Sequence, residues 1–214
     1  MHSTMSKLKI GIKQKLKLAI VYIFTVFLVS CATTDSEISP ISEKATYQQD
    51  QVQQQLTKLK KWQAKGVIGI IYNNKADSAN YIYSQNGNDF SIKLYGPLGI
   101  GSVEIYGDLN SVTLENSKGQ KAQAKDAKAL MLEQLGWYVP VEGLKYWIKA
   151  ISVPSIEKSI QLNKNNLVDN LTQDGWNIKY KGYELVDDKY PLPSKIRMSR
   201  DNLILKIVIK SWQV

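Results

Sequence analysis

The feature that most constrains the fold is a succession of short β-like runs between residues 64 and 116. The runs are rich in Val, Ile, Tyr and Thr, and Asn, Gly, Pro and Asp separate them at close spacing. This pattern is typical of strands joined by tight turns. We therefore predict an antiparallel meander whose five strands span residues 64–73, 79–85, 89–95, 101–107 and 111–116.

Two helix-like segments interrupt the strands in the middle of the chain. One begins at Asp126, and the second, over residues 141–150, presents Leu144, Trp147 and Ile148 on one side. Strand patterns then resume, and the last run alternates apolar residues with Lys206 and Lys210. The predicted later strands span residues 166–172, 176–185, 195–199 and 203–212.

A further helix is predicted before the first strand, from about residue 47 to 62. Thr46 and Gln49 resemble a capping box, and apolar residues then recur at helical spacing. The apolar stripe could line a binding cavity, or it could simply cover a sheet. Its members are Val52, Leu56, Leu59 and Trp62.

These elements together indicate a mainly β domain with helices, of the α+β class. A sheet of so many antiparallel strands must close, stack or be covered, because its edges and its apolar face cannot all be left in water. We therefore predict a curved, partly closed barrel over residues 47–214, with the helices at 47–62 and 126–149 as its lid.

The N-terminus has the organisation of a secretion signal, which we assign to residues 1–30. Residues 1–30 contain five lysines and no acidic residue. Residues 18–29 are almost wholly apolar, but this run is short for a membrane-spanning helix of ~20 residues. Leu28-Val29-Ser30-Cys31 then matches a lipobox. An uncleaved anchor helix is the alternative.

Cys31 is the only cysteine of the chain, so it cannot form an internal disulfide. We predict that it becomes the lipid-modified first residue, carrying an S-diacylglycerol and an N-palmitoyl group. Ala32 stands where an Asp would favour retention at the inner membrane, which favours the outer membrane of a Gram-negative bacterium. Residues 31–46 lack apolar periodicity and are predicted to be an acylated, solvated tether.

Composition excludes several classes of chemistry. Removal of residues 1–30 lowers the net charge from +9 to +4, and no nucleic-acid-binding motif is present. The only histidine, His2, lies in the predicted signal, so Ser-His-Asp, Cys-His and zinc-thiolate sites are excluded from the mature domain. We predict that the protein is not an enzyme, that it binds no metal, cofactor or nucleic acid, and that it is a monomer.

Several motifs recur in order across residues 47–214 as they do in a known family. The turn Gly96-Pro97-Leu98-Gly99 joins the third and fourth predicted strands. The other motifs are Trp62 with Gly66, Asn116 to Gln120, Pro140 to Ile148, Asp174-Gly175-Trp176, Leu192-Pro193 and Trp212. In these respects the chain resembles the LolB family of outer-membrane lipoprotein receptors.

The resemblance implies an incomplete, half-open antiparallel β-barrel with an α-helical lid. Its apolar cavity would accept the acyl chains of lipoproteins from the periplasmic carrier LolA, and the domain, facing the periplasm, would insert them into the outer membrane. Partners would be a LolA-like carrier, acylated cargo and outer-membrane lipids. In the family the loop leucine promotes insertion, a role that falls on Leu98; the alternative is an ordinary type I turn.

As candidate cavity-lining residues we select Leu56, Leu59, Trp147 and Ile148. Two other functions remain open at this point. An acylated β-scaffold for envelope assembly would have a filled core, and a carrier of lipopolysaccharide or phospholipid would have a similar cavity with a different cargo.

Overall fold

The computed structural model describes residues 38–96, 101–108 and 110–214, and the strands among them form one antiparallel sheet. These strands are β1 (Ile38–Pro40), β2 (Lys61–Tyr72), β3 (Lys75–Asn86), β4 (Asp89–Tyr95), β5 (Ser102–Gly107), β6 (Val112–Asn116), β7 (Lys121–Ala124), β8 (Lys158–Leu162), β9 (Val168–Gln173), β10 (Trp176–Val186), β11 (Tyr190–Arg200) and β12 (Leu203–Gln213). Their order is β7-β6-β5-β4-β3-β2-β12-β11-β10-β9-β8, and β1 pairs with the end of β10.

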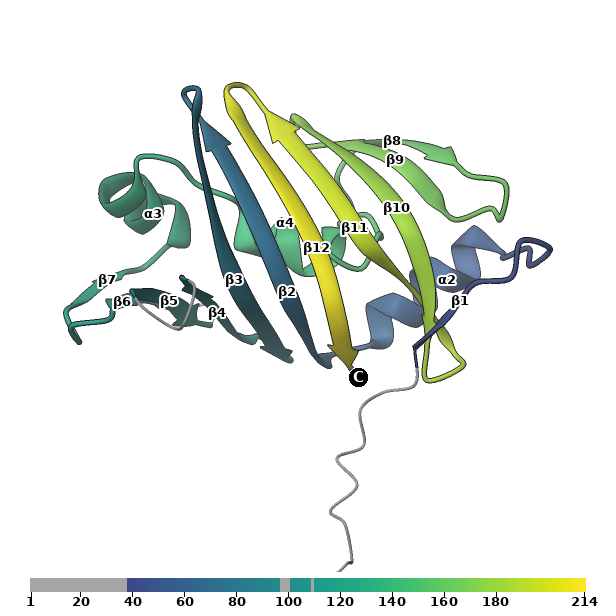
Figure 1. Cartoon of the computed structure of the whole chain (residues 1–214), viewed down its shortest axis with the longest axis horizontal. Helices are drawn as coiled ribbons and strands as arrows, with labels where there is room; N and C mark the ends of the chain where they lie inside the picture. Colours follow the sequence, from purple (N-terminus) through teal and green to yellow (C-terminus); the bar gives the residue numbers. More distant parts are fainter. Residues whose placement is uncertain (1–37, 97–100, 109) are drawn as a thin grey trace, which may run out of the picture. The chain divides into compact units, whose positions relative to one another are not determined.

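The barrel is incomplete, as the sequence predicted. Within the described part of the chain, β7 pairs only with β6 and β8 only with β9, so the two ends of the sheet do not join. Figure 1 shows β4 to β7 bending away from the plane of β2, β3 and β12. The sheet is therefore curved without closing on itself.

Short turns with left-handed backbone conformations connect the long strands. Asn73 and Asn74, with φ of 49° and 63°, link β2 to β3, and Asp174 and Gly175, with φ of 50° and 73°, link β9 to β10. Asn, Asp and Gly tolerate positive φ, and two-residue turns of this kind match the twist of a hairpin. The turn residues identified in the sequence thus fix the strand ends.

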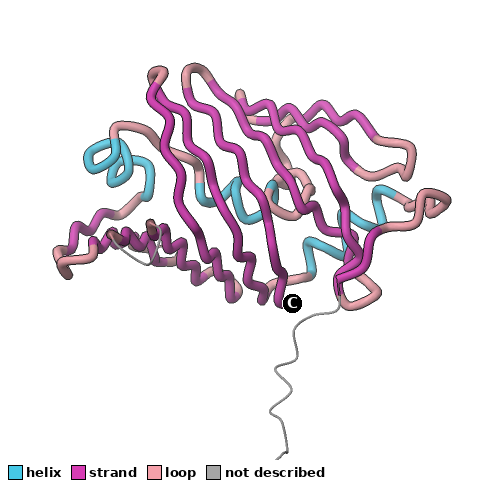
Figure 2. The backbone as a smooth tube through the Cα atoms, viewed as in Figure 1, coloured by secondary structure: helices cyan, strands magenta, loops and turns pink. Residues whose placement is uncertain are grey.

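Three described helices accompany the sheet: α2 (Gln49–Lys58), α3 (Ala127–Leu135) and α4 (Val141–Trp147). In Figures 1 and 2, α4 and α2 lie behind the long strands, on one face of the sheet. We call this the inner face and the opposite one the outer face. The Asp126 carboxylate caps α3 by accepting a 2.7 Å hydrogen bond from the Ala129 N–H. No helix within the described ranges has the length and apolar character needed to cross a membrane.

The first predicted helix was too long at its C-terminal end. It ends at Lys58, and Trp62 belongs to β2, where it lies opposite Gln85 of β3. Trp62 pairs with β3, and from Gln63 onward β2 pairs with β3 on one side and β12 on the other, so the backbone groups of this segment are satisfied in the sheet. The region 126–149 divides into α3 and α4, and β7 and β8 are additional short strands.

The end of the predicted tether is also structured. Strand β1 begins at Ile38, within the range assigned to the tether. Ile38 lies opposite Val186 in the β1–β10 pair, and the Asn165 side-chain amide donates 2.6 Å and 3.2 Å hydrogen bonds to the carbonyls of Ala45 and Ser42. Residues 38–45 are therefore held on the domain, although Ser42, Glu43 and Lys44 remain exposed to solvent.

The core lies between the inner face and the helices. Burial alternates along β12, where Leu203, Leu205, Ile207 and Ile209 are buried and Lys206, Val208 and Lys210 are exposed. This alternation shows directly that one face of the sheet meets the helices and the other meets solvent.

Candidate functional site

The predicted cavity-lining residues lie between the helices and the inner face, but most of them are packed together in this structure. Leu56 of α2 has no exposed surface, and Trp147 and Ile148 are each 1% exposed. Leu59, directly after α2, is half-buried at the rim. Three of the four candidates thus belong to a closed apolar interior, and Leu59 lies at its edge.

Trp147 is held in place by polar contacts at two of its atoms. Its indole N–H donates a 2.9 Å hydrogen bond to Oε1 of Gln173, and its carbonyl accepts a 2.9 Å hydrogen bond from the Tyr180 hydroxyl. Gly143 leaves room for the ring, because a Cβ there would lie 2.7 Å from the indole. These contacts attach α4 to β9 and β10.

The Gln173 side chain is the centre of this attachment. It is 2% exposed, and besides Trp147 it bonds the Val153 N–H (2.8 Å), the Val153 carbonyl (3.0 Å) and the Ile156 carbonyl (3.0 Å). A buried amide with every hydrogen-bonding group satisfied fixes the geometry around it. The segment after α4 is therefore tied to the sheet.

Helix α2 is attached to the same segment by two polar contacts. Gln53 and Ser152 form a reciprocal pair, in which the Gln53 amide donates to the Ser152 carbonyl at 2.9 Å and accepts from the Ser152 N–H at 3.1 Å. The Lys149 ammonium donates to the carbonyls of Leu56 and Leu59 at 2.7 Å and 3.1 Å. These carbonyls belong to the end of α2, where a cation is favourable.

Lys149 is unusual because it is a lysine with only 4% of its surface exposed. Burial, together with the smaller effect of the nearby charges of Lys60 and Lys145, lowers its pKa to about 8. Its ammonium also lies 6.0 Å from the ring centroids of Trp62 and Tyr146. The burial of Lys149 was not predictable from the sequence, because nothing in its local pattern distinguishes it from an exposed lysine that follows an apolar helix face.

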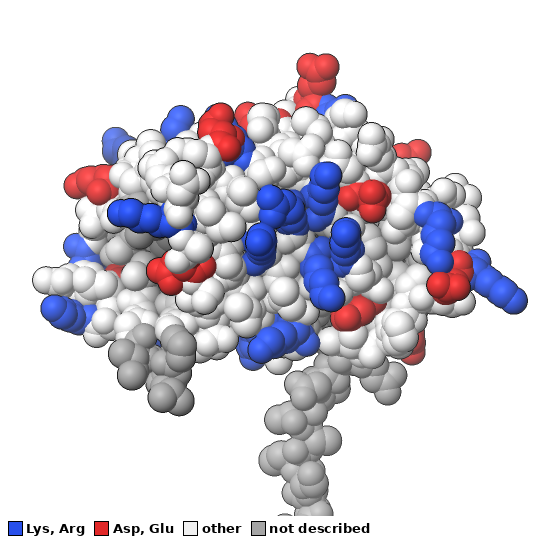
Figure 3. Space-filling view, turned by 45° about the horizontal axis from the view of Figure 1, so that its top comes forward, with Lys and Arg blue, Asp and Glu red and all other residues white. Residues whose placement is uncertain are grey.

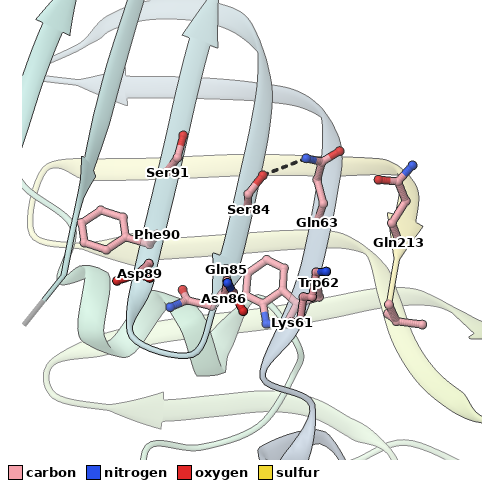
Figure 4. Close-up of a pocket in the computed structure, with 11 residues that line it drawn as sticks. Lys61, Trp62, Gln63, Ser84, Gln85, Asn86, Asp89, Phe90, Ser91 and Gln213 are labelled. Atoms are coloured by element: carbon pink, nitrogen blue, oxygen red, sulfur yellow. Dashed lines mark hydrogen bonds between the residues drawn. The ribbon is translucent and has the colours of Figure 1, made fainter.

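Two cavities meet at Trp62 on the rim of the sheet. One, of about 510 Å³, lies at the ends of β2, β3, β4 and β12, with Phe90 and Val214 among its lining residues. Figure 4 shows that Trp62 and Phe90 are part of it, and that Gln63 and Ser84 are joined by a hydrogen bond across β2 and β3.

The second cavity, of about 300 Å³, lies between the end of α2, the β3–β4 turn and α4. Its apolar surface comes from Leu59, Trp62 and Tyr146, and its charges come from Lys60, Lys145 and Lys149. Trp62 is itself packed edge-on against Tyr83 and Trp212, with centroids 4.7 Å and 5.7 Å away. The rim thus combines aromatic surface with positive charge.

Two predicted functional positions lie outside the described residues. Cys31 precedes them, and the predicted insertion loop is described only at Gly96, whose N–H donates a 3.1 Å hydrogen bond to the Gly101 carbonyl. Pro97, Leu98 and Gly99 lie between these two glycines and outside the description. Their roles stay predictions.

The chemistry available at the rim is that of binding. Among the described residues, no group of three or more His, Cys, Asp or Glu side chains could hold a metal ion. The available groups are aromatic rings, aliphatic side chains, amides and lysines, which suit an apolar ligand with a polar or anionic end.

The fold is similar to that of a solved LolA superfamily protein. A crystal structure of a LolA superfamily protein from Nitrosomonas europaea aligns with a TM-score of 0.53 at 8% identity, covering 79% of this chain and 94% of that one. At this identity the likeness concerns the fold alone.

Sequence comparison identifies the family. The family model for "Outer membrane lipoprotein LolB" matches residues 60–212. The chain is 65% identical over 210 residues to the outer-membrane lipoprotein LolB of Francisella tularensis subsp. novicida (strain U112), covering 98% of this chain and 100% of that protein. It is 33% identical over 198 residues to the LolB of Pseudomonas fluorescens (strain Pf0-1), covering 92% and 96%. The chain therefore belongs to the LolB family of outer-membrane lipoproteins.

Proposed function

We propose that this protein accepts acylated lipoproteins from a LolA-like periplasmic carrier and inserts them into the outer membrane. It would be anchored there by its own acylated Cys31, with the domain facing the periplasm. The observation that carries the proposal is the apolar interior between the half-open sheet and α2 and α4, with cavities at its rim to which Trp62 and Leu59 contribute.

The energetics of the cargo explain why a shielded interior is needed. Each methylene removed from water contributes ~0.8 kcal/mol, so exposing one chain of about sixteen carbons costs on the order of 10 kcal/mol. Free diffusion of acylated cargo through water is therefore negligible. Transfer between two apolar interiors and then into a bilayer avoids this cost at each step and requires no nucleotide.

The helices are the parts of the domain that would move to admit the acyl chains. Leu56, Trp147 and Ile148 are buried in the same apolar core, and we propose that they contact acyl chains when the interior is loaded. The polar contacts of Lys149 and Gln53 attach α2 at few points, which would let α2 move as a unit.

A transfer assay tests the receptor function. Carrier loaded with an acylated lipoprotein is mixed with the non-acylated chain, residues 32–214, and cargo is followed by pull-down. We expect cargo to move to the chain. Cargo that stays on the carrier would refute the receptor function and favour an envelope scaffold, whereas preferential binding of lipopolysaccharide or phospholipid would favour a different lipid carrier.

Two glutamate variants separate acceptance from insertion. Leu98→Glu should still accept cargo but fail to deliver it to liposomes, because a carboxylate at the loop opposes entry into the bilayer. Leu59→Glu should reduce acceptance itself by placing a charge at the rim. Leu132→Glu is the matched control, since Leu132 is 43% exposed on α3 and does not line the cavity that contains Leu59, and it should behave as the unchanged chain.

A further inference from the structure

The outer face of the sheet carries two rows of basic side chains that lie directly opposite one another on neighbouring strands. In the first row, Lys179 of β10 is opposite Arg197 of β11, and Arg197 is opposite Lys206 of β12. In the second, Lys181 of β10 is opposite Lys195 of β11. We call these five residues the basic face, and Figure 3 shows Lys and Arg side chains gathered near the middle of this side of the molecule.

This arrangement opposes folding. Directly opposite residues of an antiparallel pair have Cβ atoms about 4.5–5.5 Å apart, and like charges there are destabilising. Within the described part of the chain, no member of the basic face forms a salt bridge with a carboxylate. The next residues along the two rows are not acidic either. Asn170 lies opposite Lys179, Gly69 lies opposite Lys206, and Val208 lies opposite Lys195. An external anion would relieve this repulsion.

The form of the basic face favours an extended anionic surface over a single small ligand. Its charges are spread over three adjacent long strands and are mostly lysines, which are mobile point charges on flexible stems. Val208 lies beside Lys195 in the second row and is 40% exposed, so an aliphatic side chain stands among the cations. A bilayer with anionic headgroups presents both matching components.

The N-terminal end of the described chain places a bilayer near the basic face. Ile38 is paired with Val186 at the end of β10, the strand that supplies Lys179 and Lys181. The seven Cα–Cα steps from Cys31 to Ile38 span at most about 25 Å when extended. If Cys31 is acylated as in the proposed function, the bilayer stays within that distance, which gives it a high effective concentration at the basic face.

We propose that the basic face docks on the anionic phospholipid headgroups of the bilayer that holds the protein's own lipid anchor, and so orients the domain on the membrane. The proposal rests on the acylation of Cys31, which belongs to the proposed function, but not on cargo transfer. Each cation near an anionic membrane contributes about fivefold to the docked population, so three contribute on the order of 100-fold.

The test uses the intact acylated chain carrying Val208→Cys, labelled with a polarity-sensitive dye. Because Cys31 is the only native cysteine and is acylated in this form, the dye marks the basic face alone. The protein is placed in phosphatidylcholine vesicles with or without phosphatidylglycerol, each containing headgroup spin-labelled lipid. We expect quenching in the anionic vesicles only, and its loss at high salt.

A triple variant and a matched control make the test specific. Lys195→Gln, Arg197→Gln and Lys206→Gln together should abolish the quenching and leave the midpoint of urea unfolding unchanged or higher, because repulsion is removed. Lys44→Gln, Lys118→Gln and Lys125→Gln change the net charge equally at exposed positions and should keep the quenching.

The outcomes separate docking from the other functions. Equal quenching in neutral and anionic vesicles, or quenching unaffected by the triple variant, would overturn the proposal. Dye burial that appears only when a carrier protein is added would also overturn it, in favour of an acidic protein partner. Failure of the chain to float with neutral vesicles would refute the anchor, whereas failure of cargo transfer alone would leave the docking result valid.

Discussion

Replacement of Lys149 by methionine should remove a pH dependence that the buried ammonium gives to folding. The pKa of this group falls from an ordinary value of 10.5 to about 8 in the folded chain, chiefly because of burial. A difference of roughly 2.5 pK units corresponds to about 3 kcal/mol, at 1.36 kcal/mol per unit.

The sign of the effect follows from proton binding. Between pH 8 and 10.5 the unfolded chain binds the lysine proton more often than the folded chain does, so the free energy of unfolding rises with pH in this window. Below pH 8 both states carry the proton, and the folded chain bears the full cost of the buried charge. From pH 7 to 9.5 we expect Lys149 to contribute an increase of about 2 kcal/mol.

Urea unfolding of the chain and of Lys149→Met at pH 7 and 9.5 measures this contribution as a difference of differences. The upper limit stays below pH 10, because burial raises the pKa of Tyr81 and Tyr83 and these tyrosines add an opposite dependence above that value. Lys44→Met, at an exposed lysine, should keep the increase. If Lys149→Met shows the same rise as the unchanged chain, the ammonium is not buried at cost and the reasoning fails.

Two other substitutions test the packing around the site. Gly66→Ala should lower the free energy of unfolding by about 3 kcal/mol or more, because its Cβ would collide with the Val208 carbonyl on β12. Gly69→Ala meets only ordinary contacts and should lower it by about 1 kcal/mol or less. Chemical denaturation of the two variants compares these losses. Gln173→Leu should cost about 3–5 kcal/mol by leaving the Trp147 indole N–H and neighbouring backbone groups without partners, and tryptophan fluorescence during denaturation would show it; a loss below 1 kcal/mol would contradict the assigned network.

The strands were predictable because local and tertiary signals agree in them. The turn at Asn73 and Asn74 and the alternation along β12 reflect backbone preferences and a one-sided core, both visible in the sequence. The N-terminal part of β11 was missed because Pro191 and Pro193 argue against a strand. These prolines are tolerated because β12 pairs with β11 only from Lys195 onward, leaving that segment bonded on the β10 side alone.

The site was less predictable because long-range packing creates it. Trp62 continues the helical spacing of α2, and only its pairing with Gln85 of β3 places it in the sheet at the rim. Lys149 follows α4 with no local sign of burial, and the carbonyls that accept its hydrogen bonds come from residues about ninety positions earlier. Leu56, Trp147 and Ile148 were recognisable as one apolar set, but their sequence does not distinguish a packed core from an open cavity.

The proposed function gives a physical reason why a packed core and a cavity for acyl chains look alike in the sequence. A receiver of acyl chains must not expose its apolar interior to water while empty, and a core in which Leu56 and Trp147 are both buried meets this requirement. Loading then replaces one set of apolar contacts with another, so the net cost is set by the polar contacts that must break. Among the described residues those contacts include Lys149 with the end of α2, Gln53 with Ser152, and the Gln55 amide with the Lys189 carbonyl. Variants that weaken them, such as Gln53→Leu, should therefore accelerate cargo uptake in a stopped-flow transfer assay while leaving the sheet intact, and slower uptake would show that α2 is not the moving part.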